Sequence, residues 1–421
     1  MNRQIVLVLT LFLTLSVTPF EAAVTDVAAT PKPTMIDEAL ARSVVDRIAI
    51  EVARIRALEF KQPVPVSVVN DEQALAQNLD SLEEQGALEE LVDAEVVMRH
   101  LGLAQPTDNI LELFTDAMRE QIGGYYDPRV GEFYLLDDMA AGMVEILTAH
   151  ELTHALEDQH FELDKLLEDS STNDDAIFAR SSVTEGSATL LMTLYTVQMA
   201  FDDLDEETLG GIQDEAVNRL PPSIMRQMLA PYTLGMTFVQ RGNAMNWMAS
   251  GFPVEDINNL YSSPPLSSEQ ILHPEKYWDA DQRDDPILVT MGEVGAAMGS
   301  GWSAGLSDVL GELNIAVMVG AKTPSPDDPE ALMGLSWTNR AARGWGGDRY
   351  QLWRKGDRSV TLLSTVWDSE LDAEQFVAAM AGHEQMQLLQ KGDRVAMVFG
   401  DCPKKRAKAA LGAMLREPLA P

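Results

Sequence analysis

The stretch that decides the fold is residues 143–163, MVEILTAHELTHALEDQHFEL, which surrounds the motif His150-Glu151-Leu152-Thr153-His154. Its apolar residues recur at the spacing of an amphipathic helix, namely at Met143, Ile146, Leu147, Leu152 and Leu156. Positions i and i+4 of a helix lie about 40° apart around the axis and about 6 Å apart along it. His150 and His154 therefore reach one metal ion from one face. Glu151 lies beside them, where its carboxylate can accept a proton from metal-bound water.

A catalytic zinc ion needs a third protein ligand and one position left open for water. We expect Glu185, because it lies on the next long helix, predicted over 174–201, whose apolar residues indicate a strongly buried face. The neighbouring Gly186 permits a close approach between helices. His160, six residues after His154, is the alternative ligand. An unbroken helix would carry it about 15 Å beyond His150 and about 80° off that face, out of reach of the metal.

The segments before the motif predict a helix, a small sheet and further helices. We expect a helix over 35–60, an edge strand over 62–69, two or three helices up to residue 121 and a β-hairpin over 124–136 that turns at 127–131. Asp137 or Asp138 is the expected cap of the helix that carries the motif. A hairpin in that place offers a strand with which an extended peptide can pair.

The segments after the motif predict more helices and then a second, smaller sheet. The prolines at 221, 222, 231, 264 and 265 are expected to separate short helices. Strands are predicted over 350–353, 359–367 and 394–399, and helices over 372–381 and 404–415. The fold class is therefore α+β and predominantly helical. Residues 30–285 would form a zincin-like metallopeptidase domain, and residues 286–421 a small C-terminal α+β domain.

The first residues predict export from the cell. Arg3 precedes an apolar run from Ile5 to Val17, which is too short to span a bilayer and is typical of a secretory signal peptide. The signal segment is expected to cover residues 1–29, with cleavage after residue 23 or residue 29, and an uncleaved anchor is the alternative. The mature protein would then be periplasmic or extracellular, without stable membrane insertion.

Composition excludes several classes of function. The 421 residues include 66 acidic and 31 basic side chains, a formal net charge of −35. So negative a surface repels phosphate backbones, and nucleic acid is therefore not an expected partner. A hydrophobic fraction of 46% excludes a wholly disordered chain. The single cysteine, Cys402, permits neither an intrachain disulfide nor a cysteine-based zinc site.

Peptide hydrolysis also needs a donor that stabilises the oxyanion of the tetrahedral intermediate. Tyr232, in Ala230-Pro231-Tyr232, and His273, in Leu272-His273-Pro274, occupy distinctive local sequences and are the candidate donors. A structural role is the alternative for each.

A competing motif belongs to another class of enzyme. Gly301-Trp302-Ser303-Ala304-Gly305 matches the G-x-S-x-G elbow of serine hydrolases, and His383 follows it with aspartates between. That elbow requires a strand directly before the serine, whereas this sequence has the glycine-rich segment 295–300 there. A connector between elements is therefore the better interpretation.

Four segments together resemble a poorly characterised family of exported bacterial HExxH proteins that are regarded as gluzincin-type zinc metallopeptidases. They are His150–Leu163, Glu185–Thr189, the hairpin at Gly124–Pro128 and Gly344–Tyr350. The resemblance spans most of the mature chain. It implies that His150, His154 and Glu185 are metal ligands and that Glu151 is the base. Thr189 departs from better-known gluzincins, many of which carry there an aspartate that orients a ligand histidine.

The sequence therefore predicts an exported zinc metalloendopeptidase that binds one Zn²⁺ per chain and acts on a peptide or protein substrate. Two alternatives stay open. One is a non-catalytic binding protein that zinc stabilises, and the other is a serine hydrolase that uses Ser303.

Overall fold

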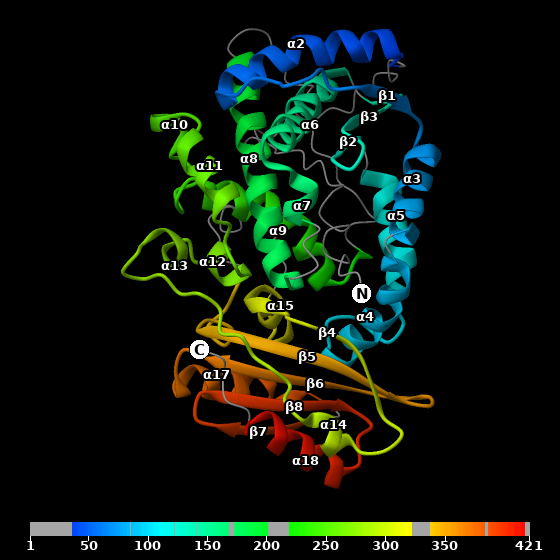
Figure 1. Cartoon of the computed structure of the whole chain (residues 1–421), viewed down its shortest axis with the longest axis vertical. Helices are drawn as coiled ribbons and strands as arrows, with labels where there is room; N and C mark the ends of the chain where they lie inside the picture. Colours follow the sequence, from blue (N-terminus) through cyan, green and yellow to red (C-terminus); the bar gives the residue numbers. More distant parts are fainter. Residues whose placement is uncertain are drawn as a thin grey trace, which may run out of the picture.

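The structure, a computed structural model, describes residues 36–84, 86–121, 123–139, 141–167, 172–200, 219–321, 337–383 and 386–416. The expected signal peptide and its cleavage sites lie outside these residues. The described chain is a mixed α+β protein, in which a large helical part with a small sheet lies above a second sheet (Figure 1). None of the described helices has the length and apolar character needed to cross a membrane.

The helical part is formed by residues from both sides of the motif. Before and through the motif the elements are α2 (Glu38–Arg56), β1 (Val66–Val69), α3 (Asp71–Glu84), α4 (Ala87–Leu101), α5 (Ile110–Gln121), β2 (Gly124–Asp127), β3 (Glu132–Leu136) and α6 (Ala141–Phe161). After it come α7 (Leu163–Leu167), α8 (Asp174–Ala200), α9 (Pro222–Val239), α10 (Trp247–Ser250), α11 (Val254–Ser262), α12 (Ser268–Leu272) and α13 (Glu275–Trp278).

A three-stranded sheet lies directly before the motif helix, with strand order β1-β3-β2. β1 is parallel to β3, and β2 is antiparallel to it, so β1 and β2 are the two edges. Gly131 closes the β2–β3 turn at a φ of 70°, a conformation that glycine adopts without strain. The predicted hairpin and the predicted edge strand are confirmed. Helix α6 begins at Ala141 and Met139 is not helical, so neither Asp137 nor Asp138 directly precedes the helix, as the expected cap would.

Helix α9 corrects one expectation. The sequence predicts that Pro231 separates short helices, but α9 runs unbroken from Pro222 to Val239 with Pro231 inside it. Proline has the φ angle of a helix and removes only one backbone donor, although its ring crowds the preceding turn. Most of α9 is buried against its neighbours, and tertiary packing of this extent outweighs the local preference.

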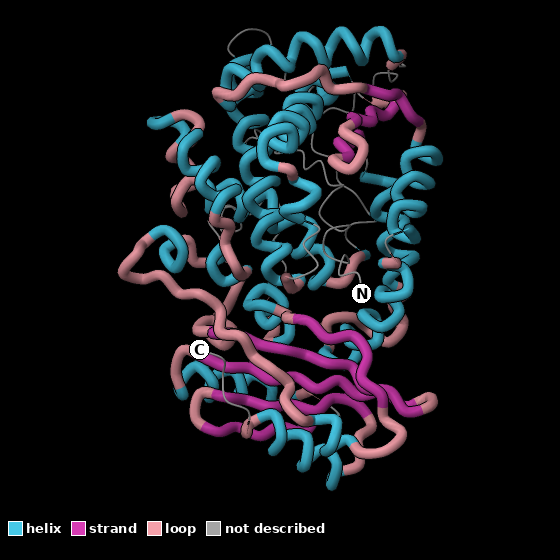
Figure 2. The backbone as a smooth tube through the Cα atoms, viewed as in Figure 1, coloured by secondary structure: helices cyan, strands magenta, loops and turns pink. Residues whose placement is uncertain are grey.

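The second sheet has five antiparallel strands in the order β4-β5-β6-β8-β7 (Figure 2). Its elements are α14 (Val294–Met298), β4 (Ser303–Asp308), α15 (Gly311–Met318), β5 (Trp345–Lys355), β6 (Arg358–Trp367), α17 (Glu370–Ala379), the 3₁₀ turn η3 (Met380–Gly382), β7 (Met386–Lys391), β8 (Arg394–Gly400) and α18 (Lys404–Met414). The three strands and two helices predicted here are confirmed. The edge strands β4 and β7 were missed, because neither contains the β-branched or aromatic residues that favour strands.

Both faces of the five-stranded sheet are covered. One face packs against α4, α15 and α17 in a cluster that includes Leu101, Leu352, Trp367 and Phe399. The other face packs against α14 and α18. Contacts also cross the expected boundary at residue 285, because Leu313 of α15 and Trp337 join the hydrophobic core of the helical part.

Candidate metal centre

Helix α6 brings the two motif histidines together. The Nε2 atoms of His150 and His154 lie 3.0 Å apart, and the two rings are nearly perpendicular, with an interplanar angle of 80°. The helix is held by apolar residues that are fully buried, among them Leu152, Ala155 and Leu156. Because these residues fix the helix on its apolar side, the two imidazoles point at one place on the side that faces α8.

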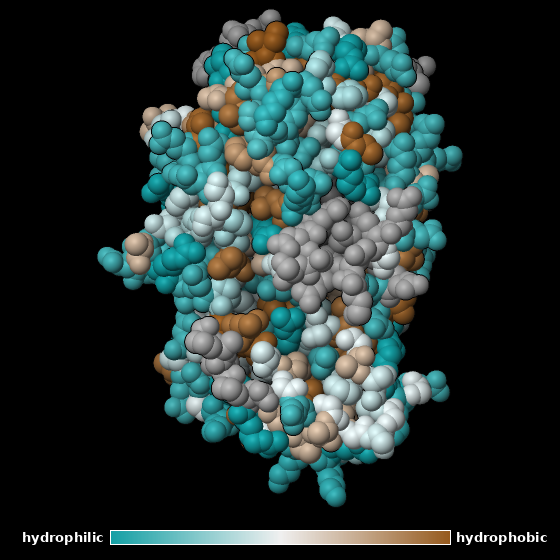
Figure 3. Space-filling view, in the orientation of Figure 1, coloured by the Kyte–Doolittle hydropathy of each residue, from teal (hydrophilic) through white to brown (hydrophobic). Residues whose placement is uncertain are grey.

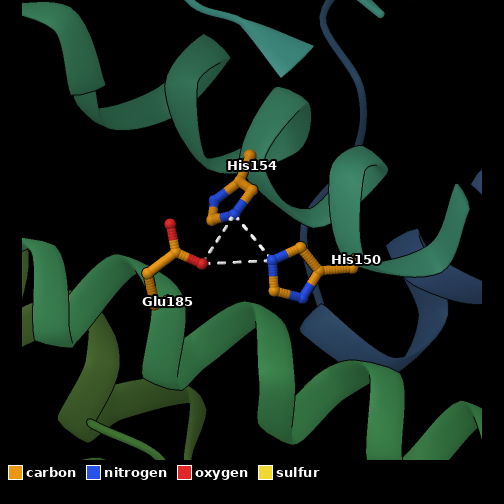
Figure 4. A group of neighbouring side chains, drawn as sticks. All are labelled: His150, His154 and Glu185. Atoms are coloured by element: carbon orange, nitrogen blue, oxygen red, sulfur yellow. Dashed lines mark hydrogen bonds and ion pairs between the residues drawn. The ribbon is translucent and has the colours of Figure 1, made fainter. Parts of the chain in front are cut away.

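Glu185 reaches the same place from α8 (Figure 4). Its Oε2 atom lies 3.1 Å from Nε2 of His150 and 3.4 Å from Nε2 of His154. One potential ligand atom from each of the three residues lies within 4.8 Å of the others. The side chains are only 5%, 13% and 8% exposed for His150, His154 and Glu185 respectively. The structure therefore assembles two imidazole nitrogens and a carboxylate oxygen around one shielded point.

The electrostatics of this point favour a cation. Burial lowers the pKa of His154, but the charge and hydrogen bond of Glu185, with Glu151 and Glu157, outweigh burial and raise that pKa to about 9. Burial likewise raises the pKa of Glu185, but the two histidines outweigh it and lower the pKa to about 2. A buried carboxylate that attracts positive charge this strongly also suits a divalent cation, and two imidazoles with one carboxylate are a ligand set of catalytic zinc sites.

Glu151 is buried beside the three side chains and is held by the hairpin. Its Oε2 atom accepts a hydrogen bond of 2.8 Å from the backbone N–H of Tyr126 in β2. Burial raises the pKa of Glu151, and the charges of His150 and His154 and the Tyr126 hydrogen bond oppose that rise only in part. A buried carboxylate beside the three side chains is placed to exchange a proton with a group bound there. The sequence carries no signal for the Tyr126 contact, because it joins residues 25 positions apart through a backbone atom.

Only one of the two candidate oxyanion donors contacts the histidines. The ring of Tyr232, on α9, stacks on that of His150 with the centroids 5.9 Å apart. His273 instead places Nε2 3.1 Å from the buried carboxylate of Glu312 on α15. The geometry therefore associates Tyr232 with the site and His273 with a separate buried cluster.

His160 points away from the other histidines. Helix α6 continues without a break to Phe161, and Nε2 of His160 lies 2.8 Å from the carbonyl oxygen of Glu59. His160 thus links α6 to the segment after α2, and the structure does not bring it to the three converging side chains.

Gly186 allows α8 to approach a neighbour closely, as expected, although that neighbour is α9. A Cβ atom on Gly186 would lie 2.2 Å from the carbonyl carbon of Gly235. The two helices therefore touch backbone to backbone, directly beside Glu185. This contact also places Tyr232 of α9 near His150.

The geometry around Ser303 does not form a nucleophile elbow. Ser303 is the exposed first residue of β4, and its hydroxyl donates to the carbonyl of Arg354 at 3.4 Å. The elbow of serine hydrolases places the serine in a tight turn after a strand and before a helix. The ring of His383 lies against Phe399, with the centroids 5.1 Å apart.

Comparison with known protein families finds one match, to a family described as Domain of unknown function (DUF8575), over residues 303–403. That range extends from β4 to the residue before α18 and contains none of the three converging side chains. No curated protein and no solved structure matches the chain.

Proposed function

We propose that the protein is an exported zinc metallopeptidase with a zincin-like helical region, in which His150, His154 and Glu185 hold one Zn²⁺ per chain. The observation that carries the proposal is the convergence of these three side chains from α6 and α8, with Glu151 buried beside them. Zinc hydrolases use three protein ligands of these types and a neighbouring general base.

The roles of the residues follow from their positions. A zinc ion held by His150, His154 and Glu185 would supply an acidified water and would polarise the carbonyl of the scissile peptide bond. Glu151 accepts the proton of that water and returns it to the leaving amine. The N–H of Tyr126 holds the Glu151 carboxylate in place. Tyr232 is the proposed donor to the oxyanion, since it is the candidate that contacts His150.

Strand β2 supports a peptide as the substrate. It is an edge of the three-stranded sheet and is joined directly to Glu151 through Tyr126. An extended peptide adds to a sheet edge through backbone hydrogen bonds, which do not depend on side-chain identity. A peptide aligned along β2 would pass beside the proposed base.

Replacing Glu151 with Gln tests the proposal. The amide cannot accept the proton, so peptide cleavage should fall by about 10²-fold to 10⁴-fold, while zinc stays near one ion per chain because the ligands are intact. The measurements are the hydrolysis of a peptide library, with and without a chelator, and the zinc content of the purified protein. Glu145→Gln, the same change on the same helix, is the control and should retain activity. Unchanged cleavage in the Glu151 variant would reject the mechanism.

A non-catalytic protein that zinc stabilises is the second candidate, and one observation favours it. Thr189, one turn after Glu185, is buried, and its hydroxyl has no hydrogen-bond partner among the described residues. Thr189 therefore orients neither histidine. Residues that orient metal ligands usually raise the activity of a metal site. Zinc binding by the wild-type chain with no chelator-sensitive cleavage would favour this second function.

A further inference from the structure

A fully buried ion pair lies next to the proposed metal site. Nε of Arg56, at the end of α2, donates to Oε1 of Glu157 on α6 at 2.6 Å, and both side chains are 0% exposed. The Arg56 guanidinium lies over the rings of Phe161 and Phe252, 5.7 Å and 5.4 Å from their centroids. Its Nη2 atom donates to Asn258 of α11. A buried charge pair specifies one arrangement of its neighbours, because any other leaves a charge unpaired.

Glu157 connects further elements through its two carboxylate oxygens. Oε1 also accepts a hydrogen bond of 2.6 Å from the hydroxyl of Ser187 on α8, and Oε2 accepts one of 2.6 Å from Tyr261 on α11. Three donors thus satisfy this carboxylate, which compensates for its loss of solvent. Through one side chain, α6 is joined to α2, α8 and α11.

The position of these contacts along the helices matters for the site. Glu157 lies three residues after His154 on α6, and Ser187 lies two residues after Glu185 on α8. The Glu157–Ser187 hydrogen bond therefore joins the two ligand-bearing helices within one turn of their ligands. Thr189, where a group that orients a ligand would be expected, makes no such bond. Besides the contacts of Glu185 with the two histidines, the Glu157–Ser187 hydrogen bond is therefore a further side-chain link between α6 and α8 close to the site.

We propose that Glu157 and Ser187 are positioning residues for the metal site. Their hydrogen bond fixes the separation and rotation of α6 and α8, and so the distance between the imidazole of His154 and the carboxylate of Glu185. This inference rests on the proposed function, since it assigns these residues to the binding of zinc. Removal of the bond weakens zinc binding and alters the coordination geometry, although neither residue contacts the metal.

The test compares two buried serines in the full-length protein. Ser187→Ala removes the hydrogen bond to Glu157. The control, Ser223→Ala on α9, removes an equally buried hydroxyl that donates to the carbonyl oxygen of Leu103. Glu157→Gln is less suitable, because it leaves the buried Arg56 charge without its partner and threatens folding. Zinc affinity is measured by competition with a chelator, and geometry by the visible absorption spectrum of the cobalt-substituted protein. Urea unfolding of each variant monitors the fold.

We expect Ser187→Ala to weaken zinc binding about 10-fold to 100-fold, the range found for residues that support metal ligands, and to change the cobalt spectrum. Ser223→Ala should leave both at the wild-type values. Wild-type zinc affinity and spectrum in Ser187→Ala, or equal losses in both variants, would overturn the inference. Failure of the proposed function is seen separately: a wild-type chain that binds neither metal overturns both proposals, whereas metal binding without hydrolysis rejects only the peptidase.

Discussion

At the scale of single residues, burial changes the behaviour of several acids in this acidic chain. Asp175, in the first turn of α8, is 4% exposed, and one of its oxygens accepts a hydrogen bond from the backbone N–H of Ser268. Its other oxygen lies so near Gly311 that a Cβ atom there would approach within 1.7 Å. Burial raises the pKa of Asp175 to about 7, and the charges of Asp348 and Glu312 add to that rise while the bonds from Ser268 oppose it.

The raised pKa of Asp175 predicts a pH-dependent stability. Between about pH 4 and pH 7 the folded state holds this proton and the unfolded state does not, so the free energy of unfolding falls as pH rises through that window. Asp175→Asn cannot ionise, and it should reduce this fall by an amount on the order of a few kcal/mol. Urea unfolding at several pH values measures the slope. Asp357→Asn, in the exposed turn between β5 and β6, is the control, and equal slopes in the two variants would contradict the assignment.

At the scale of elements, helices α8 and α9 meet directly beside the site. α8 carries Glu185 and α9 carries Tyr232, and the helices meet at Gly186 and Gly235. A Cβ atom on Gly235 would lie 2.1 Å from the carbonyl oxygen of Ser182. The two glycines thus allow a backbone-to-backbone approach that any other residue would prevent.

Replacing Gly186 with Ala should separate the two helices. A methyl group 2.2 Å from a backbone carbon cannot be accommodated by side-chain movement, so we expect a loss of about 3 kcal/mol in the free energy of unfolding. Weaker zinc binding should accompany it, since Glu185 moves with α8. Gly382→Ala is the matched control, because its Cβ would meet nothing within 4 Å; it should change stability by less than about 0.5 kcal/mol. Denaturant unfolding of both variants measures this difference. Similar unfolding midpoints would show that close packing of the helices does not require glycine at position 186.

The elements differ in how far the sequence alone predicts them. The HExxH helix, the long helix of Glu185 and the β2–β3 hairpin follow from local patterns, since periodicity and turn residues act within a few positions. The continuity of α9 through Pro231 and the edge strands β4 and β7 were not predictable, because packing and strand pairing override weak local preferences. At the site, the convergence of Glu185 on the histidines was anticipated. The Tyr126 and Ser187 contacts were not, since both join distant residues without a sequence pattern.

At the scale of the whole molecule, the net charge of −35 is the dominant property. The face seen in Figure 3 is mostly hydrophilic, with hydrophobic residues in small separate groups. Some carboxylates are neutralised locally; Lys276, for example, contacts Glu269, Asp284 and Asp368 at 2.6, 2.7 and 3.0 Å. The excess of acidic over basic side chains nevertheless leaves carboxylates that repel one another and that only the solvent screens. Repulsion of this kind destabilises a compact state.

This charge predicts that salt stabilises the protein. Raising NaCl from 0.05 M to 1 M shortens the screening length from more than about 10 Å to about 3 Å, which weakens repulsion between surface carboxylates, so Tm at pH 7 should rise by several degrees. Thermal unfolding followed by circular dichroism measures it. The same titration near pH 4.4, the isoelectric point of the sequence, is the control, because the net repulsion vanishes there. A Tm at pH 7 that is independent of NaCl would show that repulsion between carboxylates does not significantly reduce the stability of the protein.

The way in which the five-stranded sheet is covered has a consequence for the family segment at residues 303–403. The face that carries Val360, Leu362 and Val398 is sheltered by α14 and α18, and both helices lie outside that range. A fragment that contained only residues 303–403 would expose this apolar face of the sheet to water and would tend to self-associate. In this chain, the residues that complete the packing of the sheet therefore extend beyond both ends of the segment 303–403.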